Sequence, residues 1–265
     1  MTPRVHHDYV EFSGLRTHLI RSGPQVGTVF VHGVGGSCWT FLHTLSVMEV
    51  DLKWASLDLL GYGESSWLPG DVEYSTQIQA QRVCGVLDRL GLPQVSLVGF
   101  SWGGLIALQL AFLYPNVDRL VVIDIPPSSS LPPEAVAPIP WRYDDTDSAI
   151  ETMKPLAPNA SRQVLERDAL LSTTFDERGP RRKLDPRLLQ RYVFRAEDHW
   201  AAWDANRRPT LLVRGQHSPV LSPEMAATMT RRATSLSLVE IADAGHMIPL
   251  EQPDRLARAV GEFLR

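Results

Sequence analysis

A serine framed by glycines separates two apolar segments of this chain, and this arrangement restricts the folds open to it. Residues 95–98 (VSLV) have the character of a buried strand, and residues 105–113 have that of a buried helix. Between them, Gly99 and Gly103 flank Ser101 as G-x-S-x-G. A sharp strand-to-helix turn needs such small neighbours because its serine adopts a strained backbone conformation. The chain therefore favours a fold in which a buried strand leads directly into a buried helix.

Strand patterns and helix patterns alternate on both sides of this turn. The expected strands are short apolar, β-branched or aromatic runs at residues 9–12, 15–20, 28–32, 53–57, 95–98, 120–123, 209–213 and 236–241. Helical spacing follows Thr76, which forms a candidate capping box with Gln79, and recurs at 105–113, after Ser222 and at 253–264. This alternation predicts an α/β fold, with a central sheet flanked by helices.

The regular pattern breaks after residue 124. Eight of the 20 prolines fall between Pro126 and Pro158, and short helical patterns mixed with charged turns continue to about Asn206. We therefore expect two sections of one α/β core, residues 1–124 and 206–265, separated by an insertion at 125–205.

Composition excludes several classes of protein. The formal net charge of −4 offers no electrostatic basis for binding nucleic acid or an anionic membrane. Two cysteines are too few for a disulfide framework or a four-cysteine zinc site. The first residues do not read as a signal peptide, and no apolar run approaches the ~20 residues of a membrane span. We expect a cytoplasmic protein without a metal or cofactor, and both a monomer and a homodimer remain open.

Two further motifs lie at the ends of expected strands. The run VHGVGG (31–36) follows the 28–32 strand, and its glycines allow the backbone to approach a ligand closely. It lacks the spacing of a phosphate loop or a dinucleotide-binding site. Gly245-His246 follows the last expected strand. A serine needs a base to become nucleophilic at neutral pH, and histidine is the usual one.

Taken together, five segments resemble the α/β-hydrolase fold enzymes over essentially the whole chain. In family order they are VHGVGG (31–36), DLLGYGES (58–65), GFSWGG (99–104), PTLLVRG (209–215) and AGHMIPLEQPD (244–254). The resemblance implies a mostly parallel central sheet and makes the 125–205 insertion a mainly helical cap, or lid, over the active site. Asp58 would be structural and would cap a turn.

The same resemblance assigns roles to individual residues. It implies that Ser101 is the nucleophile and His246 the general base. The backbone N–H groups of Val34 and Trp102 would form the oxyanion hole.

The third member of the expected triad is missing from its usual place. The resemblance implies an aspartate in the loop after the 209–213 strand, where this chain has Ser218-Pro219 and no carboxylate before Glu224. In one interpretation Asp124, at the end of the 120–123 strand, supplies the acid. In the other, Ser101 and His246 act as a dyad, with water or Ser218 bonded to the second imidazole nitrogen. Asp243 is a third candidate for the acid.

Serine at the nucleophile position favours acyl chemistry on a small-molecule substrate. Epoxide hydrolases and haloalkane dehalogenases of this fold would have an aspartate there. We expect a hydrolase of carboxylic esters, thioesters or lactones. One alternative is a lyase or cyclase that acts on an activated, polyketide-like carbonyl compound. The other, of a different class, is a ligand-binding receptor with weak catalytic activity.

Four residues are candidates for binding the substrate. Gly33 lies in the glycine-rich loop, and three tryptophans, Trp141, Trp200 and Trp203, lie in the expected cap and can line an apolar pocket.

Overall fold

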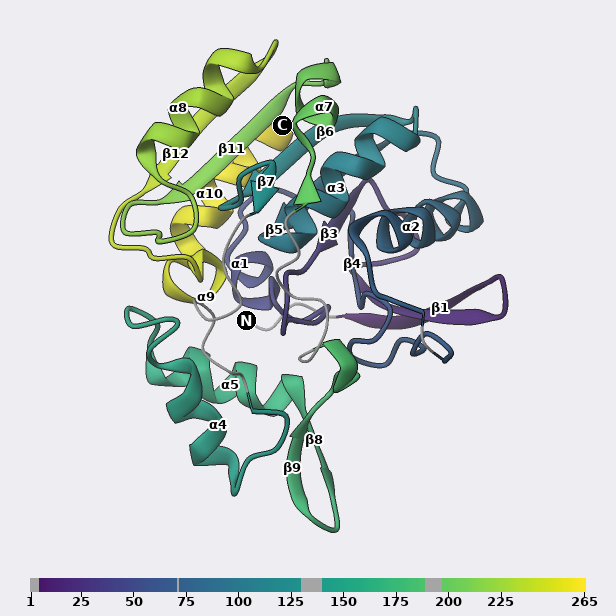
Figure 1. The fold of residues 1–265 in the computed structure, drawn as a ribbon, viewed down its shortest axis with the longest axis vertical. Coiled ribbons are helices and arrows are strands. Elements are labelled where there is room, and N and C mark those ends of the chain that lie inside the picture. Colours follow the sequence, from purple (N-terminus) through teal and green to yellow (C-terminus); the bar gives the residue numbers. More distant parts are fainter. Residues whose placement is uncertain (1–4, 71, 130–139, 189–196) are drawn as a thin grey trace.

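A single eight-stranded sheet forms the centre of the protein (Figure 1). The computed structural model describes residues 5–70, 72–129, 140–188 and 197–265. The sheet has the order β1-β2-β4-β3-β5-β6-β11-β12. Its strands are β1 (His6–Phe12), β2 (Leu15–Arg21), β3 (Thr28–Val31), β4 (Trp54–Leu57), β5 (Val95–Phe100), β6 (Val117–Ile123), β11 (Thr210–Gly215) and β12 (Leu236–Ile241). Each of the eight expected strands is present.

Strand direction in this sheet follows from the connections. The β1–β2 hairpin is antiparallel, and β2 also pairs antiparallel with β4. The pairs β4–β3, β3–β5, β5–β6, β6–β11 and β11–β12 are parallel. The predicted α/β fold with a mostly parallel sheet is therefore confirmed. The parallel strands end at one edge, so the segments that follow β5, β6, β11 and β12 meet there.

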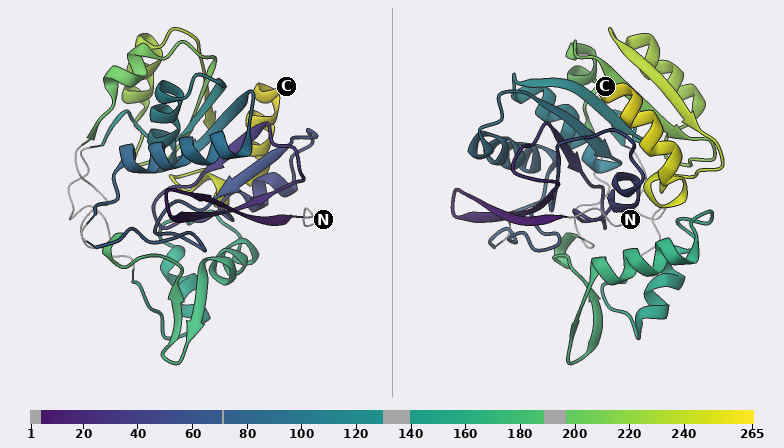
Figure 2. Two further views of the ribbon diagram at one scale, coloured as in Figure 1. Left: turned by 90° about the vertical axis from the view of Figure 1, so that its right-hand side faces the viewer. Right: turned by 180° about the vertical axis from the view of Figure 1, so that it is seen from behind.

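Helices cover both faces of the sheet (Figures 1 and 2). One face packs on α2 (Thr76–Leu90), α3 (Trp102–Leu113) and α8 (Pro223–Arg232), and the other on α1 (Leu42–Ser46), α9 (Ile248–Glu251) and α10 (Pro253–Leu264). Side chains of a strand alternate between the two layers: Val29 and Val31 lie in the first apolar cluster, and Phe30 lies in the second. Burial on both faces accounts for the continuous apolar runs that predicted these strands.

The start of α2 differs from the expected capping box. Ser75, not Thr76, is the N-cap, and its hydroxyl accepts a hydrogen bond from the Ile78 N–H at 3.1 Å. Gln79 does not return to the cap, because its side-chain amide exchanges hydrogen bonds with the backbone of Leu60. Tertiary contacts therefore override the local motif.

The described elements of the 125–205 segment are β7 (Ser128–Ser129), α4 (Thr146–Met153), α5 (Arg162–Ser172), β8 (Thr173–Asp176), β9 (Gly179–Arg182), β10 (Glu197–Asp198) and α7 (Trp200–Ala205). Within this segment, α4, α5, β8 and β9 lie beyond the edge of the sheet where the parallel strands end, whereas α7 packs on the core helix α3 (Figures 1 and 2). Residues 130–139 and 189–196 of the expected cap lie outside the described residues. The β8–β9 hairpin was not predicted, and it turns through Gly179, whose φ is +95°.

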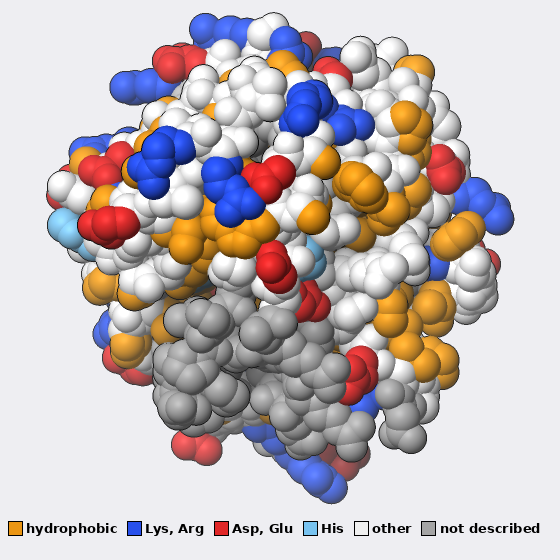
Figure 3. Space-filling view, turned by 45° about the horizontal axis from the view of Figure 1, so that its top comes forward, with side chains coloured by type: hydrophobic (Ala, Val, Ile, Leu, Met, Phe, Trp, Pro, Cys, Tyr) orange, Lys and Arg blue, Asp and Glu red, His pale blue; other side chains and the backbone are white. Residues whose placement is uncertain are grey.

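The described helices include none that is both long and apolar enough to cross a membrane. On the face that Figure 3 shows, Lys and Arg side chains are mixed with Asp and Glu side chains.

Candidate active site

Ser101 sits on the sharp turn between β5 and α3. Its φ of +53° and ψ of −127° lie in a region that side chains other than glycine rarely adopt. Its backbone N–H donates to the carbonyl oxygen of Ile123 on the neighbouring strand, at 2.8 Å. The adjacent strand thus holds the strained turn in place, and the serine stands at the start of α3.

The glycines around this serine are required by close backbone approach. A Cβ atom on Gly99 would lie 2.2 Å from the carbonyl oxygen of Gly103. One on Gly103 would lie 2.2 Å from the carbonyl oxygen of Val31 at the end of β3. Both distances are far below van der Waals contact, so the turn can form only with glycine at these two positions.

His246 bridges the serine and a buried carboxylate. Its Nε2 lies 3.0 Å from Oγ of Ser101, and its Nδ1 lies 2.7 Å from Oδ2 of Asp124. Because Nδ1 faces a carboxylate, the neutral imidazole carries its proton on Nδ1, and Nε2 is free to accept from the serine hydroxyl. Glu251 holds the histidine loop by accepting a 2.7 Å hydrogen bond from the Gly245 N–H.

Asp124 directly follows β6 and is fully buried, with a φ of +55°. Oδ1 accepts from the Gly215 N–H at 3.0 Å, and Oδ2 accepts from the Ser218 hydroxyl at 2.5 Å as well as from His246. Of the three candidate partners of the imidazole, Asp124, Ser218 and Asp243, Asp124 is the one that contacts the histidine. Ser218 contacts that acid and not the imidazole.

Asp243 points elsewhere. Its side chain is exposed and forms a 3.4 Å ion pair with Arg255. The backbone N–H of Asp243 donates to Oε1 of Gln216 at 3.2 Å.

The glycine-rich loop after β3 lies against the serine. A Cβ atom on Gly33 would be 2.8 Å from Cβ of Ser101 and 3.4 Å from its Oγ. Val34 is the next residue of this loop, and Trp102 is the first residue of α3. The first N–H groups of a helix have no partner within the helix. Trp102 is anchored by its indole, whose N–H donates to the Thr76 hydroxyl at 2.7 Å.

Sequence reasoning assigned no role to His32, which fixes this loop. The side chain is fully buried, Nδ1 donates to the Gly33 carbonyl at 2.7 Å, and Nε2 accepts from the Leu59 N–H at 3.1 Å. Burial lowers the pKa of His32, which keeps the imidazole neutral in this arrangement. Its position at the end of a strand, directly before Gly33, was the available signal.

The three tryptophans proposed for the substrate pocket lie in different surroundings. Trp141 donates its indole N–H to the Leu184 carbonyl within the cap, at 3.1 Å. Trp203, in α7, is buried in the core and donates to the Met229 carbonyl of α8 at 3.0 Å. Trp200 packs under the guanidinium of Arg232, 3.9 Å from the ring centroid. The described side-chain contacts of Trp203 and Trp200 are therefore with α8, whereas Trp141 contacts the β8–β9 hairpin.

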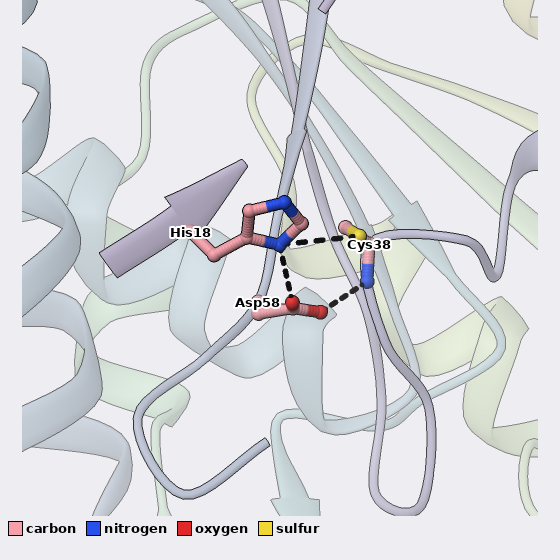
Figure 4. Close-up of side chains that lie close together, drawn as sticks. All are labelled: His18, Cys38 and Asp58. Atoms are coloured by element: carbon pink, nitrogen blue, oxygen red, sulfur yellow. Dashed lines mark hydrogen bonds and ion pairs between the residues drawn. The ribbon is translucent and has the colours of Figure 1, made fainter. Parts of the chain in front are cut away.

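One buried cluster has ligand types that a metal ion can use. His18, Cys38 and Asp58 place their potential ligand atoms within 4.8 Å of one another (Figure 4). Asp58 is already bonded: it accepts from Nδ1 of His18 and the Cys38 N–H, both at 2.7 Å, and from the Glu64 N–H at 3.0 Å.

The ionisation of this cluster fits its hydrogen bonds. Burial and the Asp58 charge raise the pKa of the Cys38 thiol well above its usual range, so the sulfur stays protonated. Although burial favours the neutral acid, the hydrogen bonds from His18 and from backbone N–H groups lower the pKa of Asp58. Asp58 therefore acts as the turn cap that the family resemblance implied.

Comparison with known proteins identifies the family of this chain. Residues 28–259 match the model of the alpha/beta hydrolase family. An esterase of Mycobacterium tuberculosis is 30% identical over 262 residues, which cover 90% of this chain and 82% of the esterase. The 2-hydroxymuconate semialdehyde hydrolase of Pseudomonas sp. (strain CF600) is 27% identical over 95% of this chain and 91% of its own length.

Solved structures show the same fold. E-2-(acetamidomethylene)succinate hydrolase superposes with a TM-score of 0.88 at 20% identity, over 98% of this chain and 99% of the other. The chain belongs to the alpha/beta hydrolase family.

Proposed function

We propose that this protein is a serine hydrolase that cleaves a carboxylic ester, thioester or lactone through an acyl-enzyme on Ser101. The observation that supports this most directly is the unbroken hydrogen-bond chain from Ser101 through His246 to Asp124, with distances of 3.0 and 2.7 Å. Relatives named as hydrolases and as an esterase favour the same chemistry.

The proposed reaction has two halves. Oγ of Ser101 attacks the carbonyl carbon as Nε2 of His246 takes the hydroxyl proton, and the alcohol, thiol or ring oxygen leaves with that proton. A water molecule then gives a proton to the same Nε2 and attacks the acyl-serine ester; Oγ of Ser101 leaves and takes that proton back, and the carboxylic acid is released. Asp124 holds the imidazole in the Nδ1–H tautomer and stabilises its positive charge in both halves.

Charge on the carbonyl oxygen would be stabilised by two backbone donors. We assign these to the N–H groups of Val34 and Trp102, because Gly33 packs on Ser101 and Trp102 opens α3. The positive end of the α3 dipole favours an oxyanion at this place.

We further propose that residues 125–205 form the cap that selects the substrate, a small molecule with an acyl or activated carbonyl group. Two backbone contacts join it to the core beside the site: the Gly63 N–H donates to the Lys183 carbonyl and the Asp185 N–H to the Gly61 carbonyl, both at 2.7 Å.

The test uses a fluorophosphonate probe and a series of p-nitrophenyl esters. Wild type should be labelled and should turn over at least one ester, whereas Ser101→Ala should lose labelling and at least ~1,000-fold in kcat/KM. Ser237→Ala, an exposed serine on β12, is the matched control and should behave as wild type. Labelling without ester turnover would favour the lyase or cyclase. Absence of labelling would contradict the nucleophile and favour the receptor.

A further inference from the structure

A buried arginine of the cap lies at the junction with the core. Arg182, the last residue of β9, is 5% exposed. Its Nε donates to the Tyr143 hydroxyl at 2.6 Å, Nη1 to the Gly35 carbonyl at 3.2 Å, and Nη2 contacts Sδ of Met153 at 3.6 Å. All three partners are neutral, and a thioether sulfur is a weak acceptor.

Unlike Arg142 and Arg181, Arg182 forms no ion pair with any residue that the structure describes. Arg142 and Arg181, which are more exposed, both bind the carboxylate of Asp176. No carboxylate oxygen of the described residues lies within 4.0 Å of the Arg182 guanidinium. A buried charge without an opposite charge is costly. An incoming anion would remove that cost.

The guanidinium contacts the glycine-rich loop of the candidate active site. Its Nη1 partner, Gly35, belongs to the loop whose Gly33 packs directly on Ser101. An anion bound by Arg182 would therefore lie close to the proposed oxyanion hole.

The other partners of the guanidinium pack in a cluster that also contacts the histidine loop. Tyr143 and Met153 belong to the apolar cluster between α4 and α5. Met247, which directly follows His246, packs against the same cluster. Arg182 thus lies between the oxyanion loop and the histidine loop, on the side that faces the cap.

One acidic side chain acts on this cation from a greater distance. Burial raises the pKa of Asp168 on α5 to about 6, while the positive charge of Arg182 opposes that rise. Its carboxyl group makes no hydrogen bond among the described residues. Asp168 acts on Arg182 from beyond ion-pair distance, so it does not occupy the N–H donors of the guanidinium.

We propose that Arg182 binds a free carboxylate of the substrate, so that the enzyme prefers acyl compounds whose chain ends in a carboxylate group. This inference rests on the proposed function, since it names the substrate class of the same site. A guanidinium has five N–H donors, and after its three contacts each Nη keeps one. Two donors on one planar group match the two oxygens of a carboxylate, whereas a phosphate monoester would bring nearly two negative charges.

The test compares matched pairs of methyl esters. Monomethyl succinate, glutarate and adipate are assayed against methyl esters in which a carboxamide replaces the free carboxylate. Wild type should prefer the charged member of the best pair by about tenfold or more in kcat/KM, as expected for a charge-assisted hydrogen bond. Arg182→Gln should abolish that preference, because it should slow the charged ester about tenfold or more beyond any effect on the neutral ester. Arg181→Gln, the neighbouring arginine, is the control and should keep the preference.

Two outcomes would overturn the proposal. In the first, wild type hydrolyses both members of every pair equally well. In the second, Arg182→Gln slows the charged and neutral esters by the same factor, which would make Arg182 a structural link between cap and core.

A binding experiment on wild type separates this proposal from the proposed function. Free glutarate should slow fluorophosphonate labelling of Ser101, and glutaramide should not. Protection by glutarate without hydrolysis of any ester would support the carboxylate site and contradict ester hydrolysis. Ester hydrolysis with equal effects of glutarate and glutaramide would support hydrolysis and contradict the carboxylate site. Because this measurement uses wild type alone, it tests the proposal even if Arg182→Gln does not fold.

Discussion

The Ser218 hydroxyl lies 2.5 Å from Oδ2 of Asp124 and donates to it. Ser218 occupies the loop in which the family resemblance places the acid, so the serine at that place supports a carboxylate that comes from β6 instead. The same hydroxyl accepts from the N–H groups of Val220 and Leu221, at 3.1 and 3.2 Å. Its lone pairs are therefore used by the backbone, and its proton is directed to Asp124.

Replacing the carboxylate should impair catalysis without unfolding the protein. Asp124→Asn keeps the shape of the side chain but favours the wrong tautomer of His246, and we expect kcat to fall by roughly 100- to 10,000-fold. Steady-state kinetics on the best ester, together with thermal unfolding, measure both effects. Asp118→Asn, at the opposite end of β6, is the matched control. Unchanged activity in Asp124→Asn would leave the dyad as the better account of the site.

The Ser218–Asp124 contact predicts that the acid can be moved back to the loop. In the Asp124→Asn background, Ser218→Asp should restore at least about tenfold in kcat. The new carboxylate would lie beside the position of Oδ2 of Asp124, the atom that contacts Nδ1 of His246. In the wild-type background the same change places two carboxylates together and should lower activity. No recovery in the double variant would show that the loop cannot bring a carboxylate to Nδ1 of His246.

Three glycine-to-alanine changes should separate folding from function. Gly99→Ala places a Cβ 2.2 Å from the Gly103 carbonyl and should cost more than about 3 kcal/mol of the free energy of unfolding. Gly33→Ala meets Cβ of Ser101 at 2.8 Å, so we expect a folded protein with at least ~100-fold lower activity. Gly23→Ala, with no atom within 4 Å, should change neither. Urea unfolding and ester kinetics on the three variants test the series.

Asp168 should make stability depend on pH. Its pKa of about 6 in the folded state lies above the ordinary value of 3.8, so the folded protein binds more protons than the unfolded chain between these values. The contribution of Asp168 to stability therefore falls as pH rises through this window. Asp168→Asn should be more stable than wild type by about 1 kcal/mol at pH 7.5 and nearly equal to it at pH 4.

Urea unfolding at the two pH values measures this difference. Glu177→Gln, an exposed acid in the β8–β9 turn, provides the control and should show no such pH dependence. A destabilised Asp168→Asn at pH 7.5 would mean that the attraction of Asp168 to Arg182 outweighs its burial.

Much of the architecture was predictable from local pattern. Strands that are buried on both faces form continuous apolar runs, which is why the sequence predicts strands at residues 95–98 and 120–123. The N-cap residue of α2 was not predictable in this way, because Gln79 forms its hydrogen bonds with the backbone of Leu60, which is distant in the sequence. The β8–β9 hairpin was missed because its residues, such as Pro180 and Arg181, carry no strand pattern.

By itself, the sequence determined the sheet-and-helix order, the glycine-framed turn at Ser101 and the histidine loop, because these depend on short-range periodicity and on backbone conformations that only certain residues adopt. Only the tertiary structure decided which acid contacts His246, since Asp124 and His246 are 122 residues apart and Asp243 is three residues away. Only the fold likewise decided that Arg182 is buried without an ion pair to a described residue, whereas Arg142 and Arg181 pair with Asp176. Proximity and burial are properties of the folded chain, because they depend on which strand ends the sheet brings to one edge.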